Sequence, residues 1–280
     1  GRIAMAQDQA NAVLTVQPGN PGAHALLSAI ALRQGRRDAA LAEIKRAIEL
    51  DTNRAVFHEN LGLIQSEDPA TASSAEAEFL KAVKLDPASL NARLLLASFY
   101  ARSNRLAEAE KAAWDAVNTD PDSLAARADV AQIILKEGDW ARAEQVLRQA
   151  SEDFADTAQG ATILADYYAS TRQFDKARSE FLNQLSRSPR NTTLQKGYIR
   201  VLIQTRDYAT AKPLVASLLQ NTPKDPEAAA LNGILLLHEG NADQASSALR
   251  DGERFVPQDD FIQYWRGKAA LAKGEINLAE

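Results

Sequence analysis

The side chains in this chain that are best suited to metal binding or catalysis are three histidines. His24 and His58 stand 34 positions apart, and His238 is distant from both. A metal site needs several histidine, cysteine or carboxylate ligands that converge on one point, and the chain contains no cysteine. We therefore expect these histidines to serve helix packing, and we predict neither a metal nor any other cofactor.

The sequence also shows no recognisable set of catalytic residues. A nucleophile requires a base close to a serine or threonine, but the chain has neither a G-x-S-x-G motif nor a glycine-rich phosphate-binding loop. The adjacent carboxylates Glu108 and Glu110, and likewise Asp259 and Asp260, fall in stretches typical of solvated helix faces or turns. The sequence therefore predicts a protein that is not an enzyme.

Composition excludes two further classes of function. The chain has 280 residues, of which 45% are hydrophobic and 25% charged, as in an ordinary folded protein. Its net charge is −5 with both signs interspersed, whereas a nucleic-acid binder needs a basic stripe that neutralises phosphates. No apolar run reaches the roughly 18–20 residues that span a bilayer. We expect no nucleic-acid partner and no membrane span in this chain.

The elements that must position these residues follow a period of 34. Alanines recur at this interval, with one step of 35, at Ala6, Ala40, Ala75, Ala109, Ala143, Ala177, Ala211, Ala245 and Ala279. Prolines keep the same phase at Pro18, Pro87, Pro121, Pro189, Pro223 and Pro257. A fixed period of this length indicates a stack of identical supersecondary units.

Each period contains two amphipathic helical patterns. In one of them the first helix is expected from Leu90 to about Ser103 and the second from Leu106 to about Asn118. A proline lacks the N–H that a helix needs, so the recurring Asp-Pro pair ends the second helix. The short turn between the two helices should hold a residue with positive φ. Four glycines occupy that place, namely Gly35, Gly138, Gly240 and Gly274.

This pattern resembles the tetratricopeptide repeat family, whose 34-residue unit reads W-x2-L-G-x2-Y…A-x3-F…P. The second full repeat carries the family residues Leu61, Gly62, Ala75, Phe79 and Pro87. The tryptophan position departs from the pattern, since His24, His58 and Arg93 occupy it. The resemblance covers essentially the whole chain and implies an all-α fold, a right-handed α-solenoid of stacked antiparallel helix pairs.

The repeat boundaries follow from this register. The full repeats are expected at 21–54, 55–89, 90–123, 124–157, 158–191, 192–225 and 226–259, with a half repeat at 1–20 and a partial repeat at 260–280. The alanines should mark places where two helices approach closely, because a larger side chain would force them apart. Since both ends interrupt a repeat, we expect a fragment of a longer array, which could associate with itself through apolar end faces.

The resemblance implies a non-catalytic scaffold that binds a peptide or a partner protein on its concave face. Family members direct defined first-helix positions into that groove. Mapped onto this chain, the groove residues are Asn60, Asn91, Ser98, Arg102, Asp129, Gln132, Lys136, Asp166, Lys196 and Arg200. The middle of the groove is then polar and of mixed sign, and Leu231, Ile234 and Tyr264 should make its far end apolar. Trp114 and Trp140 lie on second helices, where we expect them to pack between neighbouring repeats.

Two alternatives remain open for the function. The chain could be the substrate-recruiting region of a larger enzyme. It could also serve bacterial envelope or exopolysaccharide export, because its alanine-rich repeats with joints such as QPGNPGA are similar to long bacterial arrays in such systems. That second alternative would place it in the periplasm or envelope.

Overall fold

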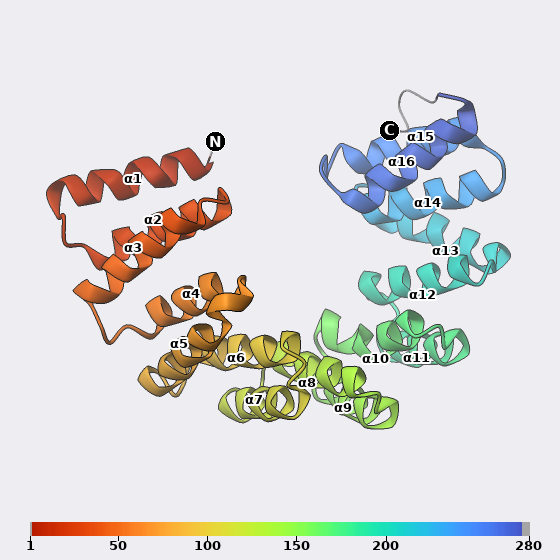
Figure 1. Cartoon of the computed structure of the whole chain (residues 1–280). Coiled ribbons are helices and arrows are strands. Elements are labelled where there is room, and N and C mark those ends of the chain that lie inside the picture. Colours follow the sequence, from red (N-terminus) through yellow and green to blue (C-terminus); the bar gives the residue numbers. More distant parts are fainter. Residues whose placement is uncertain (1, 276–280) are drawn as a thin grey trace. The chain divides into compact units, whose positions relative to one another are not determined.

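The structure is a computed structural model that describes residues 2–275 (Figure 1). These residues form sixteen α-helices and one short 3-10 helix, with no strand among them. In chain order they are α1 (Arg2–Val16), α2 (Pro21–Arg33), α3 (Arg37–Leu50), α4 (Ala55–Ser66), η1 (Pro69–Thr71), α5 (Ala72–Leu85), α6 (Leu90–Arg102), α7 (Leu106–Thr119), α8 (Leu124–Glu137), α9 (Trp140–Asp153), α10 (Ala158–Ser170), α11 (Phe174–Arg187), α12 (Thr192–Gln204), α13 (Tyr208–Asn221), α14 (Pro226–His238), α15 (Ala242–Glu253) and α16 (Asp260–Lys273). The all-α prediction is confirmed.

The chain divides into two compact units, residues 1–146 and 147–280, and α9 runs across the division. Within each unit, an even-numbered helix pairs with the odd-numbered helix that follows it, as α2 does with α3 and α14 with α15. The even-numbered helices from α2 to α16 begin at the first residues of the repeats expected from the sequence. The second helix expected after α16 would begin at residues 276–280, which lie outside the described residues.

The first helices of successive repeats also contact one another. In the first unit α2 contacts α4, α4 contacts α6, and α6 contacts α8; in the second unit α10 contacts α12, α12 contacts α14, and α14 contacts α16. The side of each unit that these even-numbered helices share is called the first-helix face below. It corresponds to the side on which the sequence places the groove residues.

The periodic alanines lie where the two helices of a repeat cross. Seven of them are fully buried, namely Ala40, Ala75, Ala109, Ala143, Ala177, Ala211 and Ala245. Ala6 is half-buried, and Ala279 lies outside the described residues. The hydroxyl of Ser28 donates to the carbonyl of Ala40 at 2.8 Å, so a side chain on α2 touches the backbone of α3. The expectation of close approach is confirmed at Ala40, and the full burial of the other six alanines agrees with it.

Aromatic rings fill the space left by glycines in the core. A Cβ added to Gly62 would lie 2.8 Å from the Phe79 ring, and one added to Gly197 would lie 2.4 Å from the Phe181 ring. Both phenylalanines are fully buried. Phe79 also contacts Phe99 of the next repeat, with 5.7 Å between ring centroids. Each ring therefore needs a facing position without a side chain.

The turn inside every repeat except the second full one carries one residue in the left-handed conformation. These residues are Gly35 (φ 71°), Asn104 (φ 58°), Gly138 (φ 85°), Arg172 (φ 60°), Arg206 (φ 62°), Gly240 (φ 80°) and Gly274 (φ 79°). The expectation for the four glycines is confirmed, and two arginines adopt the same conformation. In the second full repeat, the 3-10 helix η1 replaces this turn and accommodates the extra residue of the 35-residue step.

The joints between repeats are held by two recurring side-chain contacts. The N-cap side chains of the first helices accept a hydrogen bond from the N–H three residues on, at Asn20, Ser89, Ser123, Thr157, Asn191, Asp225 and Asp259. Four positions after the N-cap, side chains bond the carbonyl oxygen six residues earlier. These pairs are His24–Pro18 (3.2 Å), His58–Thr52 (3.1 Å), Arg127–Pro121 (3.3 Å), Gln195–Pro189 (2.7 Å) and Gln263–Pro257 (2.9 Å).

Candidate functional site

His24 and His58 each tie the two helices of a repeat together, whereas the His238 ring stacks on Tyr208 with 4.6 Å between ring centroids. His24 Nδ1 lies 2.7 Å from Glu43 Oε2, and His58 Nδ1 lies 2.5 Å from Glu78 Oε2. The second nitrogen of each ring contacts the backbone carbonyl of its joint. Both nitrogens of each ring are thus engaged in packing contacts. Across residues 2–275, no group of three or more histidine, aspartate or glutamate side chains could hold a metal ion.

The adjacent carboxylates also make structural contacts. Glu108 accepts a hydrogen bond from Arg105 Nε at 2.7 Å, and Glu110 pairs with Arg142 of the next second helix. Asp259 caps α16 by accepting a hydrogen bond from the Ile262 N–H at 2.9 Å. These contacts give each of the three acids a role in holding helices.

The first unit presents a small polar pocket on its first-helix face, between α6 and α8. The pocket measures about 130 Å³ and is lined by Ala97, Ser98, Ala101, Arg102, Asp129, Gln132, Ile133 and Lys136. We call it the α6–α8 pocket. Five of these residues belong to the groove predicted from the sequence, and the structure brings them together although they come from two repeats.

Asp129 is the notable charge of the α6–α8 pocket. Its side chain is half-buried, and burial raises the pKa of this carboxyl above its usual range. Among the described residues, no hydrogen bond or ion pair reaches this carboxylate. Ser98, Gln132 and Lys136 beside it are exposed. The pocket therefore offers polar groups that a ligand can engage.

Two other predicted groove residues lie outside this pocket. Asn91 Nδ2 donates to Glu59 Oε2 at 2.6 Å, and Ser89 Oγ donates to Glu59 Oε1 at 3.2 Å. Glu59 is only 5% exposed, so the Asn91 amide helps to satisfy a buried carboxylate at the joint of α4 and α6. Asn60 is half-buried on α4.

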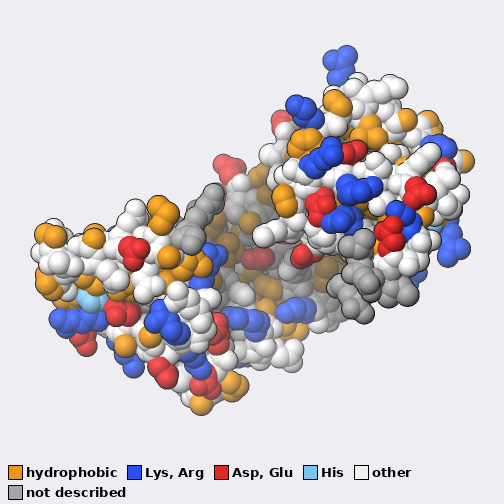
Figure 2. Space-filling view, turned by 90° about the horizontal axis from the view of Figure 1, so that it is seen from above, with side chains coloured by type: hydrophobic (Ala, Val, Ile, Leu, Met, Phe, Trp, Pro, Cys, Tyr) orange, Lys and Arg blue, Asp and Glu red, His pale blue; other side chains and the backbone are white. Residues whose placement is uncertain are grey.

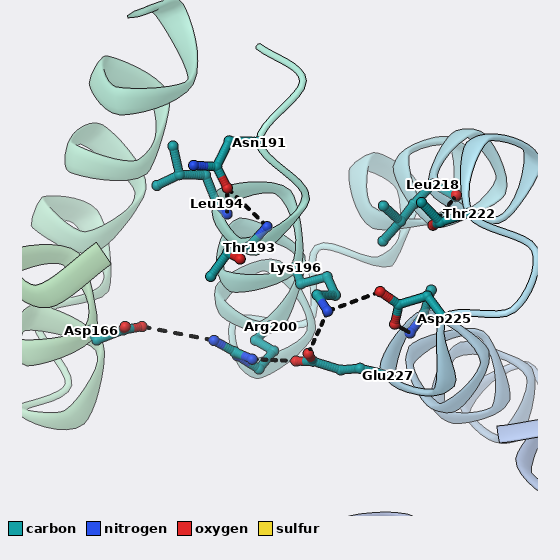
Figure 3. Close-up of polar contacts among 11 residues, drawn as sticks. Asp166, Asn191, Thr193, Leu194, Lys196, Arg200, Leu218, Thr222, Asp225 and Glu227 are labelled. Carbon is teal, nitrogen blue, oxygen red and sulfur yellow. Dashed lines mark hydrogen bonds and ion pairs between the residues drawn. The ribbon is translucent and has the colours of Figure 1, made fainter. Parts of the chain in front are cut away.

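In the second unit, the predicted groove residues join one ion-pair network across α10, α12 and α14 (Figure 3). The Lys196 ammonium lies 3.0 Å from Asp225 Oδ2 and 3.0 Å from Glu227 Oε2. Arg200 pairs with Glu227 and lies 3.9 Å from Asp166 Oδ1. The network links three consecutive repeats.

The pKa values of this network follow from its contacts. Burial alone would lower the pKa of Lys196, but hydrogen bonds to Asp225 and Glu227 outweigh it, so that the pKa is raised. Burial would raise the pKa of Asp225, yet the Ala228 N–H and Lys196 hold it below its usual range. Both groups are therefore charged near neutral pH, and each already has its counter-ion.

A larger pocket of about 420 Å³ lies beside this network on the first-helix face of the second unit. It is lined by Lys196, Arg200, Asp225, Pro226, Glu227, Val256, Asp259, Phe261 and Ile262. We call it the α12–α16 pocket. The sequence identified Lys196 and Arg200 but missed its apolar wall, because that wall comes from the first residues of α14 and α16 and from the joint between α15 and α16, not from mid-helix positions. The aromatic residue Phe261, two positions after the Asp259 cap, was the available signal.

The sequence places the apolar end of the groove at Leu231 and Ile234, and this prediction is wrong. Both side chains are core residues, 1% and 2% exposed, because they face inward from α14. Tyr264 is 58% exposed and lies against Trp265, with 5.5 Å between ring centroids. Phe261, 41% exposed, supplies apolar surface instead.

Trp114 and Trp140 are more exposed than the expected packing between repeats implies. They remain 38% and 56% exposed, and the Trp114 indole N–H donates to Glu110 at 3.2 Å. Both lie on second helices, and neither lines one of the two pockets.

The surface in Figure 2 shows basic and acidic side chains interspersed, with hydrophobic side chains among them. No helix within the described range combines the length and the apolar character needed to cross a membrane.

Comparisons with known proteins agree with this repeat architecture. A family model described as tetratricopeptide repeat matches residues 1–55, 72–123 and 131–191, and a second model with the same description matches 168–232 and 202–271. No curated protein gives a significant match.

Two solved structures illustrate the likeness in fold. A tetratricopeptide repeat protein from Parabacteroides merdae ATCC 43184 is 15% identical, with a TM-score of 0.54 over 90% of this chain and 99% of that one. Yeast Tom70 is 16% identical, with a TM-score of 0.67 over 98% of this chain and 59% of that one. The family models together span most of the chain, and its helix pairs repeat with the same period. The chain belongs to the tetratricopeptide repeat family.

Proposed function

We propose that the chain is a non-catalytic interaction scaffold that binds a peptide or a partner protein along its first-helix face. Proteins of this family generally act as protein-interaction scaffolds. The proposal extends that general role to a defined surface of this chain, formed in each unit by the even-numbered helices.

The α6–α8 pocket is the observation that carries the proposal. Its exposed Ser98, Gln132 and Lys136 project from two neighbouring first helices around the half-buried Asp129. A buried carboxylate gains free energy when a partner supplies a hydrogen bond or a positive charge. A partner that lies across α6 and α8 can supply both.

Site-specific photo-cross-linking tests this surface. A photoreactive phenylalanine analogue replaces Gln132 in one variant and Ser98 in another, and each variant is irradiated in lysate of the source organism. We expect both variants to form the same discrete cross-linked species, because both positions are exposed on the proposed binding face.

Two variants on second helices provide the control. Leu80 on α5 is 47% exposed, and Lys111 on α7 is exposed as well. The same analogue at these positions should give no discrete species. Cross-links that form at Leu80 and Lys111 but not at Gln132 and Ser98 would move the interface off the first-helix face.

A further inference from the structure

We propose that the α12–α16 pocket holds a bulky apolar side chain of the partner that is adjacent, in the partner's sequence, to a basic residue. This inference rests on the proposed function and specifies the partner's chemistry at one point of the first-helix face.

The two cations of the pocket are not available to an acidic partner. Lys196 is shared by two carboxylates at 3.0 Å each, and its side chain is only 16% exposed. Arg200 is occupied by Glu227 and lies near Asp166 (Figure 3). An acidic ligand would have to displace these intramolecular partners, so the pocket disfavours it.

The pocket has a hydrophobic wall made by Pro226, Val256, Phe261 and Ile262. Ile262 is buried and anchors this wall to the core of the second unit, whereas Phe261 is 41% exposed at its rim. The volume of about 420 Å³ lies in the range of pockets that hold small ligands, roughly 300–1,000 Å³. A single aromatic or leucine side chain fits within such a space and would cover Phe261.

The charge at the rim is negative. Three carboxylates and two cations line the pocket, and both cations are engaged by Asp225 and Glu227. Asp259 Oδ1 accepts the cap hydrogen bond from the Ile262 N–H at 2.9 Å, and no cation pairs with this carboxylate among the residues that the structure describes. A lysine or arginine next to the apolar side chain would complement it.

Three labelled synthetic peptides test the inference by fluorescence anisotropy with the full chain. The first carries a phenylalanine flanked by lysines within a Gly/Ser sequence; the second has alanine for the phenylalanine, and the third has glutamates for the lysines. We expect the first to bind, and we expect removal of the aromatic ring to weaken binding roughly tenfold or more. The glutamate peptide should bind more weakly still, and added salt should weaken the lysine peptide.

Two variants assign these preferences to the pocket. Asp259→Asn removes the charge but keeps a good N-cap for α16, and it should reduce the preference for lysine over glutamate severalfold. Phe261→Ala removes the exposed ring and should reduce the preference for phenylalanine over alanine. Asp175→Asn and Leu182→Ala on the second helix α11 are matched controls at exposed positions, and they should change neither preference.

Several outcomes would overturn the inference. These are equal binding of the three peptides, absence of binding to the unsubstituted chain, or unchanged preferences in both pocket variants that remain folded by circular dichroism. If cross-linking at Gln132 and Ser98 still succeeds in that case, the proposed function stands and only the partner chemistry assigned to this pocket fails. If the peptides bind as expected but cross-linking occurs only on second helices, the pocket is real and the extended binding face is not.

Discussion

At the scale of single residues, the alanine at each helix crossing sets how closely two helices approach. Ala143 on α9 has no exposed surface and packs in a cluster with Ala109, Ala113 and Val130. A core at native density has no room for three additional carbon atoms. The identity of this residue therefore matters through its volume alone.

Ala143→Leu should lower the free energy of unfolding by about 1–3 kcal/mol, because overpacking forces neighbouring side chains out of their preferred rotamers. Urea unfolding followed by circular dichroism measures this change. Ala107→Leu on α7, at an exposed position, is the control and should stay within about 0.5 kcal/mol of the unsubstituted chain. Equal midpoints for the two variants would contradict the packing of α9 described above.

The alanines were predictable from the sequence, whereas the pairing of the groove charges was not. Period and residue size suffice to place a small side chain at a crossing. Lys196, in contrast, contacts Asp225 and Glu227 at distances of 29 and 31 residues along the chain. Those contacts depend on how α14 stacks on α12, and no local pattern in the sequence encodes that stacking. The charge of a groove residue therefore says little about the charge that a partner meets.

At the scale of elements, the turns are more uniform in conformation than in sequence. Gly138 and Arg172 occupy the same place in successive repeats, with φ of 85° and 60°. The left-handed region costs an ordinary side chain roughly 1–2 kcal/mol. Glycine identifies such a turn in the sequence, but an arginine in the same conformation gives no such signal.

A reciprocal exchange tests this cost. Arg172→Gly should stabilise the chain by about 1 kcal/mol and Gly138→Arg should destabilise it by about the same amount. No heavy atom lies within 4 Å of a Cβ added to Gly138, so steric clash does not contribute to the change. Thermal unfolding of the two variants provides the measurement, and shifts of the same sign would exclude backbone strain as the cause.

The helix boundaries were otherwise well predicted. Leu90 and Leu106 begin α6 and α7 as the sequence indicated, because the apolar spacing points to both of them. The exception is η1, where the inserted residue produced a 3-10 turn at Pro69 and not a longer version of the usual turn. An insertion changes the period in the sequence without revealing which conformation absorbs it.

At the scale of the molecule, each repeat of a solenoid is stabilised by its neighbours in the stack. Phe79 shows this coupling, since its ring fills the space above Gly62 and also contacts Phe99 of the following repeat. Loss of such a residue should lower the stability of its own repeat and the adjacent repeats more than that of distant repeats.

Phe79→Leu should reduce the hydrogen-exchange protection of amides in α4, α5 and α6, because a smaller side chain leaves a cavity among them. Protection in α12, α13 and α14 should remain unchanged. Hydrogen-exchange mass spectrometry of the full chain resolves the two regions. A uniform loss of protection along the chain would instead indicate that all repeats unfold as one cooperative unit.

The side-chain hydrogen bonds at the joints between repeats bear on which residue types can replace one another there. His24, Arg127 and Gln195 differ in charge, shape and size, yet each bonds a proline carbonyl six residues earlier. Where this bond forms, the position carries a long side chain with a nitrogen at its tip, and residues of different kinds meet this condition. In two other repeats Ala161 and Ala229 occupy the same position and cannot form the bond. A search pattern written in terms of hydrogen-bond donors would recognise these joints where one written for tryptophan would not.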